Sequence, residues 1–172
     1  MGVIGLGGLG HMAVKLAVGL GADVTVLSRS DDNEKDALDL GADGLLVSSD
    51  ENAMAQAQSS FDLIIDTIPV KHDLTPYLRL LDIGGALVMV GQVGAIDGLD
   101  SEPMVLGRRC IVGSAIGGIA ETQELIDFCA KKKILPECEI IQIGEVNDAL
   151  QRLKRSDVRY RFVIDMASLA AP

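Results

Sequence analysis

A glycine-rich loop close to the amino terminus limits what this chain can fold into. It follows an apolar stretch at residues 2–5, which we expect to form a strand, and precedes a helix expected at residues 11–20. Four glycines and two leucines make up the loop: Gly5, Leu6, Gly7, Gly8, Leu9 and Gly10. In this context Gly5 permits a tight turn, Gly7 lets the backbone approach a pyrophosphate, and Gly10 lets the helix pack closely on the sheet. The loop therefore predicts a dinucleotide site in which the first amides of the helix face the pyrophosphate.

Apolar runs and helix-period segments alternate along most of the chain. Strands are expected at residues 2–5, 23–27, 44–47, 63–66, 86–90 and 110–113, and helices at 11–20, 33–40, 51–58, 74–81 and 120–132. This alternation predicts an α/β fold with a doubly wound parallel sheet and helices on both faces. A second pattern then follows, with a strand at 139–143, a helix at 146–154 and a strand at 159–165. We therefore expect a domain at residues 1–135 and a βαβ tail at 136–172, which either extends the sheet or belongs to a neighbouring domain.

Composition excludes several classes of protein. The 172 residues are 48% hydrophobic, which excludes a disordered chain. With 15 Lys and Arg against 25 Asp and Glu, a net charge of −10 and 3% aromatic residues, the chain is unsuited to binding nucleic acid. Its three cysteines match neither a disulfide framework nor a CxxC site, and no segment is long and apolar enough for a membrane span. We expect reduced thiols and a cytoplasmic protein.

The end of the second expected strand predicts which dinucleotide is bound. NAD-binding proteins usually place Asp or Glu there to accept a hydrogen bond from the ribose 2′-hydroxyl. This chain instead has Ser28, Arg29 and Ser30, which offer hydroxyls and a guanidinium to a 2′-phosphate. We therefore expect NADP(H), with a preference that Asp31 and Asp32 reduce because they add negative charge close by.

Several strings of the sequence form a recognisable set. They are residues 5–15, the strand end at 24–30, Asp66-Thr67, residues 106–109, Gly113-Ser114, Glu121-Thr122 and the closing residues 157–165. Together they resemble the coenzyme-binding half of zinc-containing alcohol dehydrogenases of the medium-chain dehydrogenase/reductase type, in particular the NADP-dependent cinnamyl alcohol dehydrogenase branch. The resemblance covers nearly all of the chain. It implies a Rossmann-type fold and, in a complete enzyme, hydride transfer between NADPH and an aldehyde that yields a primary alcohol.

The resemblance also implies cofactor contacts. They fall on the loop from Gly5 to Gly10, on Ser28, Arg29 and Ser30 for the 2′-phosphate, and on Thr67, Gly91, Ser114 and Ile116 for the rest of the dinucleotide, with the last three on the nicotinamide side. The chain departs from the branch in having Asp32 and Asn33 where a lysine is common, unless Lys35 substitutes for it. It also has Ala115 where the branch often has Phe.

In the family that the chain resembles, the catalytic zinc and the proton relay belong to a domain that precedes the glycine loop. This sequence begins at its first expected strand, so it looks like part of something longer, and we expect it to bind no zinc and to reduce no aldehyde alone. We expect His11 to be a packing or helix-start residue and His72 to lie in a solvated loop. Cys110 and Cys129 are expected to be small core residues.

Other functions remain open from the sequence. A zinc-free reductase similar to quinone oxidoreductases needs no metal, although its loop usually begins with Ala where this chain has Gly5. A nucleotide-sensing or interaction module without catalysis is another alternative. A methyltransferase normally needs an acidic residue at the position of Ser28. Finally, a short apolar strand around residues 109–114 at the sheet edge predicts a homodimer that pairs edge to edge.

Overall fold

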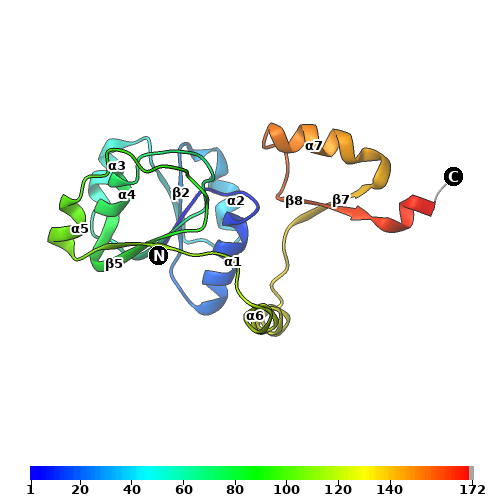
Figure 1. Ribbon diagram of the computed structural model, residues 1–172, viewed down its shortest axis with the longest axis horizontal. Coiled ribbons are helices and arrows are strands. Elements are labelled where there is room, and N and C mark those ends of the chain that lie inside the picture. Colours follow the sequence, from blue (N-terminus) through cyan, green and yellow to red (C-terminus); the bar gives the residue numbers. More distant parts are fainter. Residues whose placement is uncertain (171–172) are drawn as a thin grey trace. The chain divides into compact units, whose positions relative to one another are not determined.

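The computed structural model describes residues 1–170 and separates into two compact units (Figure 1). Unit 1 comprises Met1–Ile134, and unit 2 begins at Leu135. No helix within residues 1–170 has the length and apolar character that a bilayer crossing requires.

Unit 1 is built on a six-stranded parallel sheet with the strand order β3-β2-β1-β4-β5-β6. The strands are β1 (Gly2–Ile4), β2 (Thr25–Ser28), β3 (Gly44–Val47), β4 (Phe61–Asp66), β5 (Leu81–Met89) and β6 (Cys110–Gly113). The order reverses between β1 and β4, so the connections that leave these two strands run to opposite faces and leave a crevice at their carboxyl ends. The predicted doubly wound α/β fold is confirmed.

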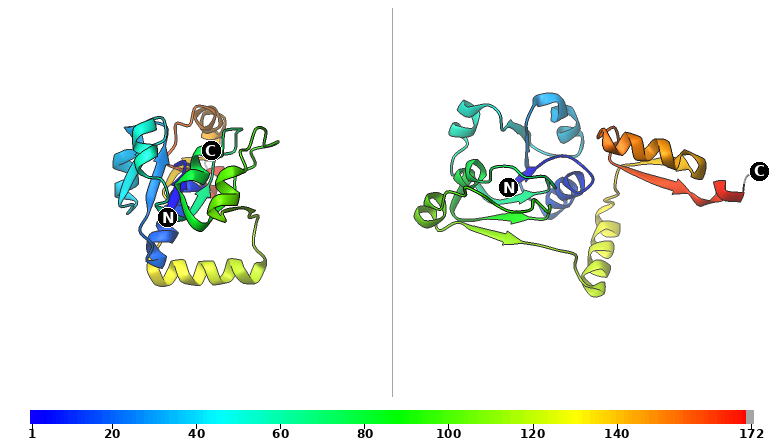
Figure 2. Two further views of the ribbon diagram at one scale, coloured as in Figure 1. Left: turned by 90° about the vertical axis from the view of Figure 1, so that its left-hand side faces the viewer. Right: turned by 45° about the horizontal axis from the view of Figure 1, so that its top comes forward.

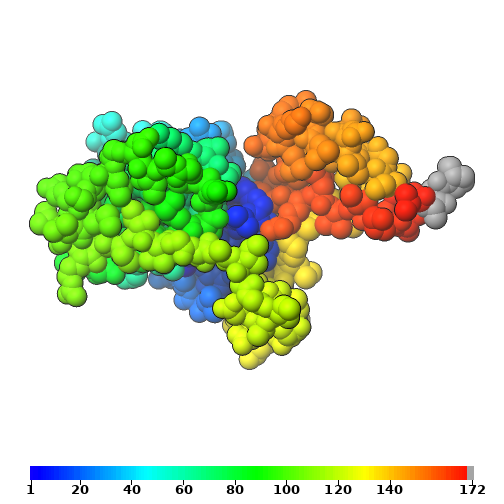
Figure 3. Space-filling view, in the orientation of Figure 1, coloured from blue at the N-terminus to red at the C-terminus, as the bar shows by residue number. Residues whose placement is uncertain are grey.

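Helices cover both faces of this sheet (Figure 2). They are α1 (Gly10–Leu20), α2 (Glu34–Asp39), α3 (Glu51–Gln56), α4 (Thr75–Leu80) and α5 (Glu102–Gly107), and a single 3-10 turn, η1 (Asp31–Asn33), precedes α2. A further helix, α6 (Ile119–Lys132), follows β6. One core forms where α1 and α2 meet Val3 and Val26, and a second where α3, α4 and α5 meet Ile4, Ile64 and Leu87. Helix α5, on the surface of unit 1 at the left of Figure 3, was not predicted from the sequence.

On one face of the sheet, the side chains become more exposed from β2 to β6, because helices cover less of that face. The residues Val26, Val3, Ile65, Val88 and Val112 are register partners across five strands and share this face. Val26 and Val3 are fully buried beneath α1 and α2, Ile65 and Val88 are half-buried, and Val112 is 44% exposed. We expected β4 and β5 to be covered on both faces, and this expectation is wrong for the face that lies beyond α1. The reason is that α6 does not pack along these strands.

Unit 2 is a two-stranded parallel sheet with one crossover helix. Its elements are β7 (Cys138–Gln142), η2 (Ile143–Glu145), α7 (Val146–Lys154), β8 (Arg161–Asp165) and η3 (Met166–Ala170). Strands β7 and β8 pair with each other and form a sheet separate from that of unit 1.

Candidate dinucleotide site

The glycine loop turns directly from β1 into α1. Gly5 adopts a positive φ of 85°, and its amide donates to the carbonyl of Leu27 on β2 over 3.0 Å. A Cβ atom at Gly10 would lie 2.1 Å from the carbonyl oxygen of Gly5, so only glycine permits this approach of helix to loop. A Cβ at Gly7 would meet no atom within 4 Å among the described residues, because Gly7 faces open space.

The start of α1 is suited to an anion. Leu9 occupies the N-cap position and its side chain makes no capping hydrogen bond within residues 1–170, and no acidic residue lies in the first turn of the helix. Helix-start amides that face open space bind phosphate groups well, because the helix dipole adds a partial positive charge. The loop therefore has the shape and the electrostatics of a pyrophosphate cradle.

The segments that follow β4 and β5 lie next to the glycine loop. The Thr67 hydroxyl donates to the carbonyl of Ile4 over 2.7 Å, which ties the end of β4 to the end of β1. Gly91 follows β5, and a Cβ at that position would lie 2.3 Å from the carbonyl oxygen of Ile68. These contacts hold three chain segments together at one edge of the sheet.

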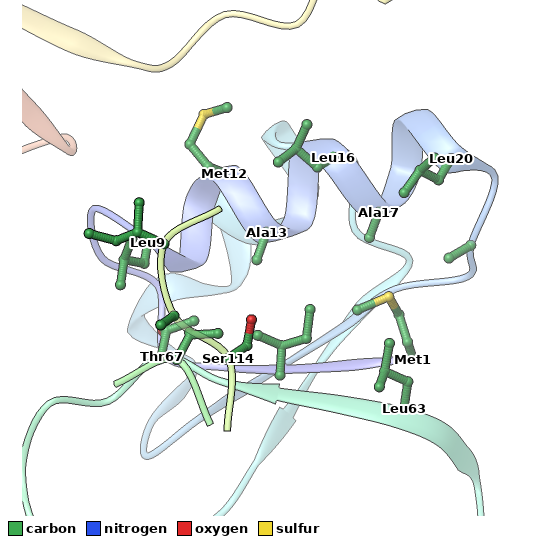
Figure 4. Close-up of a pocket in the computed structure, with 15 residues that line it drawn as sticks. Met1, Leu9, Met12, Ala13, Leu16, Ala17, Leu20, Leu63, Thr67 and Ser114 are labelled. Carbon is green, nitrogen blue, oxygen red and sulfur yellow. The ribbon is translucent and has the colours of Figure 1, made fainter. Parts of the chain in front are cut away.

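An apolar groove of about 570 Å³ begins at this edge and runs beneath α1 (Figure 4). Leu9, Thr67, Ser114 and Ile116 line it, so four residues predicted from the resemblance share one cavity. The other lining residues are apolar and come from α1 and the turn after it, from β4, and from positions just before β1, after β5 and after β6: Met1, Met12, Ala13, Leu16, Ala17, Leu20, Ala22, Leu63, Ile65, Val90 and Ala115. Such a surface accommodates a flat, weakly polar ring better than a charged group.

Ser28, Arg29 and Ser30 lie at the end of β2 and do not line this groove. Both hydroxyls already have partners: Ser30 donates to Asp32 over 2.7 Å, and Ser28 accepts from the Asn33 side chain over 3.4 Å. Arg29 is exposed, and its carbonyl accepts from the Ser49 hydroxyl over 2.7 Å.

A buried Asp–His pair lies beneath the segment that follows β4. Asp66 is fully buried; its Oδ1 accepts from the Ile68 amide over 3.0 Å, and its Oδ2 lies 3.2 Å from His72 Nε2. His72 Nδ1 lies 2.9 Å from the Val70 carbonyl and must donate to it, because a carbonyl has no proton to give. Nε2 and Oδ2 are close enough to interact electrostatically, although their geometry is not that of a hydrogen bond. Burial raises the pKa of Asp66, while the Ile68 amide and His72 oppose that rise.

Two expectations about reactive side chains are wrong. His72 is only 17% exposed, because it turns inward to Asp66 and packs edge-on against Tyr77. The sequence offers little signal for this pair: a histidine follows a strand-end aspartate by six residues. Cys110 is exposed on the edge strand and Cys129 is half-buried on α6, because neither element is covered as a core element would be.

Other side chains with metal-binding or catalytic potential are dispersed. His11 is fully buried at the start of α1, with Nδ1 3.0 Å from the Gly7 carbonyl oxygen, so the ring lies against the loop. Across residues 1–170, no three His, Cys, Asp or Glu side chains converge closely enough to hold a metal ion.

Comparisons with known proteins agree on one group of enzymes. Residues 8–131 match the family model described as zinc-binding dehydrogenase. A probable cinnamyl alcohol dehydrogenase from Lolium perenne is 52% identical over 167 residues, and cinnamyl alcohol dehydrogenase 3 from Arabidopsis thaliana is 49% identical over 173 residues. These alignments cover 96% and 100% of this chain and 46% of each relative, so the chain spans about half the length of the curated relatives it matches.

Solved structures give the same result. A cinnamyl alcohol dehydrogenase from Sorghum bicolor superposes with a TM-score of 0.92 at 42% identity, covering 96% of this chain and 47% of that one. The enzyme from Helicobacter pylori, solved in complex with NADP(H), gives a TM-score of 0.81 at 39% identity, with the same two coverages.

Proposed function

Because the chain belongs to the zinc-binding dehydrogenase family, we propose that residues 1–135 bind NADP(H) and that residues 136–172 are a segment of the catalytic domain. The observation that carries this proposal is the glycine loop. It leads directly from β1 into α1, Gly7 faces open space, and the loop lies where the strand order reverses. The loop residues from Gly5 to Gly10, with Leu6, Gly8 and Leu9 among them, would hold the pyrophosphate.

The remaining contacts would orient the two ends of the dinucleotide. Ser28, Arg29 and Ser30 would receive the 2′-phosphate, with Arg29 offering a planar fork of donors. Thr67 would contact the dinucleotide at the end of β4. Gly91, Ser114 and Ile116 would line the nicotinamide side, where the groove would exclude water from one face of the ring. The NADP(H)-bound relative from Helicobacter pylori supports the assignment of the cofactor.

In the complete enzyme we propose hydride transfer between NADPH and an aldehyde or primary alcohol. This rests on the similarity to cinnamyl alcohol dehydrogenases over nearly all of the chain. The cofactor supplies the hydride, and the residues of this chain bind and orient it. We propose no zinc-binding role for residues 1–170, because no three His, Cys, Asp or Glu side chains converge among them. The unpaired cysteines support a cytoplasmic location.

Three glycine variants test the cradle. Gly7→Ala puts a methyl group into space that no atom of residues 1–170 occupies, so the melting temperature should not change. The methyl group would occupy the space proposed for the pyrophosphate, so the affinity for NADPH should fall about tenfold or more. Gly10→Ala should destabilise the fold because of its clash with the Gly5 carbonyl. Gly44→Ala, which meets no atom within 4 Å on β3, is the neutral control.

Calorimetry with NADPH, NADH and S-adenosylmethionine measures these effects. Arg29→Glu should weaken NADPH by about tenfold or more and leave NADH nearly unchanged. Normal NADPH binding by Gly7→Ala, or binding of S-adenosylmethionine in preference to both dinucleotides, would contradict the proposal.

We also propose a homodimer that pairs through β6 and its flanks, residues 109–114. Strand β6 is the last strand of the sheet, and Cys110 and Val112 on it are exposed. A two-fold edge contact would satisfy its outward amides. Light scattering at tens of micromolar should give twice the mass of one chain, and a monomer mass would exclude this interface.

A further inference from the structure

The end of β2 carries a hydrogen-bond pattern unlike that of a free phosphate site. Ser30 donates its hydroxyl proton to Asp32 Oδ2 over 2.7 Å. A serine hydroxyl has one proton, so Ser30 cannot donate to a 2′-phosphate while it donates to Asp32. The carboxylate therefore occupies the donor that a 2′-phosphate would use.

The charges around this position also oppose a phosphate. Asp31 and Asp32 are both exposed in η1, directly after Ser30. Lys35 would be a compensating cation, but it points along α2 to Asp39 and lies 3.1 Å from that carboxylate. Among residues 28–35, Arg29 is therefore the cation without an ion pair to a carboxylate of residues 1–170, and Asp31 and Asp32 follow it closely in the sequence.

A carboxylate here suits the other dinucleotide. NAD(H) carries a 2′-hydroxyl, which donates a hydrogen bond and has no charge to be repelled. Asp32 is exposed and lies one hydrogen bond away from Ser30, the residue assigned to the 2′ position. It can therefore take the part that an acidic residue at the strand end plays in NAD-binding proteins.

We propose that Asp32 is a specificity-determining residue, which accepts a hydrogen bond from the 2′-hydroxyl of NAD(H), opposes the 2′-phosphate of NADP(H), and so lets this chain bind both dinucleotides. The inference rests on the proposed dinucleotide site. It adds to that site a residue that reduces the preference for NADP(H) over NAD(H).

Asp31 offers a matched control. It has the same charge, the same exposure class and the adjacent position, yet within residues 1–170 its side chain makes no hydrogen bond with Ser28, Arg29 or Ser30. Asp31→Asn and Asp32→Asn therefore remove the same charge, and only the second removes the carboxylate oxygen that binds Ser30.

The test is calorimetric titration of the whole chain and both variants with NADPH and with NADH, at low and at high salt. Asp32→Asn should raise the affinity for NADPH by about five- to tenfold and lower the affinity for NADH by about two- to fivefold. Asp31→Asn should tighten NADPH by only about twofold and leave NADH unchanged. High salt should remove the effect of Asp31→Asn, because it screens exposed charges, and should preserve the loss of NADH affinity in Asp32→Asn.

Equal effects of the two variants would overturn the proposal, because Asp32 would then act only as one more surface charge. An unchanged ratio of NADPH to NADH affinity in Asp32→Asn would also overturn the proposal for Asp32. The proposed function would still hold in that case, provided that the wild-type chain binds NADPH. Failure of the wild-type chain to bind either dinucleotide would contradict both. Circular dichroism of each variant separates a loss of affinity from a loss of fold.

Discussion

The two units of this chain bury their apolar side chains to different extents. Unit 1 has two cores, on opposite faces of a six-stranded sheet, with residues such as Leu78 and Ile64 fully buried. In the described part of unit 2, Ala149 and Tyr160 are the buried hydrophobic residues, whereas Ile140 is 76% exposed. Two strands and one helix cannot enclose a core, because the open face of the sheet has no second layer.

Polar contacts take the place of a core in unit 2. Arg152 on α7 binds Glu139 over 2.8 Å and Asp157 over 3.1 Å, and its guanidinium lies 4.8 Å from the centre of the Phe162 ring. These contacts join the helix to both strands near the surface, where water weakens each of them. The comparison indicates that unit 1 is stabilised mainly by burial and that unit 2 depends on a surface network.

The largest expected effect is a core truncation in unit 1. Leu78→Ala removes a fully buried side chain and should cost about 2–5 kcal/mol in the free energy of unfolding. Ile141→Ala removes a half-buried side chain from β7 and should cost only about 1 kcal/mol. Each unit holds one of the two tyrosines, Tyr77 and Tyr160, and the chain has no tryptophan. Tyrosine fluorescence during urea unfolding can therefore follow each unit separately.

The backgrounds for this experiment are Tyr160→Phe, in which Tyr77 reports on unit 1, and Tyr77→Phe, in which Tyr160 reports on unit 2. We expect unit 2 to unfold at lower urea. A single transition, with the same midpoint for both probes and a similar shift from either truncation, would show that the units do not differ in stability.

Most of the fold follows from patterns that are local in the sequence. Strands β4 and β5 each contain a continuous apolar run, at residues 63–65 and 86–89, and α1 has an apolar stripe that ends at Gly21, which adopts the left-handed conformation. Helix α5 was missed because it is six residues long, contains Pro103 in its first turn and has too few turns to show a period. Strand β5 starts five residues earlier than expected, at Leu81, because its first residues pair with β4 through a register shift.

The candidate site was predictable where backbone geometry determines it. The glycine spacing predicts a turn that only glycine can make, and the observed clash distance at Gly10 gives the reason. Side-chain partners were less accessible to prediction. His72 looked like a solvated loop residue because its partner, Asp66, is buried six residues earlier and is brought beneath it only by the fold. The Ser30–Asp32 contact is local, but nothing in the sequence shows which hydroxyl Asp32 will bind.

A smaller effect is expected from the surface network of unit 2. Arg152→Ala removes both ion pairs and the contact with Phe162, so segments near β7 and β8 should be cleaved several-fold faster in limited proteolysis. Arg155→Ala, an exposed position one residue after α7, is the control and should change nothing. Peptides from unit 1 should appear at the wild-type rate in both variants. Equal protection of unit 2 in Arg152→Ala and the wild type would show that its packing, and not Arg152, holds it together.

One carboxylate in each unit should change the stability of that unit with pH, and the two changes should have opposite signs. Bonds from Arg152 and from the Arg159 amide lower the pKa of Glu139 below its usual 4.5, so its contribution to unit 2 is present above that value and is lost as the pH falls through the lowered pKa. Burial raises the pKa of Asp66 above its usual 3.8. In the folded state Asp66 therefore holds its proton more tightly than in the unfolded state, and its contribution to unit 1 is fully present at low pH and is lost as the pH rises through the raised pKa.

The smallest expected effect is this difference in sign. Between about pH 3 and pH 7, the urea midpoint reported by Tyr160 should fall with acid, and Glu139→Gln should flatten that dependence. The midpoint reported by Tyr77 includes other carboxylates, so the informative quantity is the difference between the wild type and Asp66→Asn. Asp66→Asn cannot ionise, and the wild type should therefore gain stability relative to this variant as the pH falls through the raised pKa of Asp66. If the stability of the wild type relative to Asp66→Asn instead grows with rising pH, the interaction with His72, and not burial, determines the pKa of Asp66. Asp66 and Glu139 would then affect the stability of their units with the same sign.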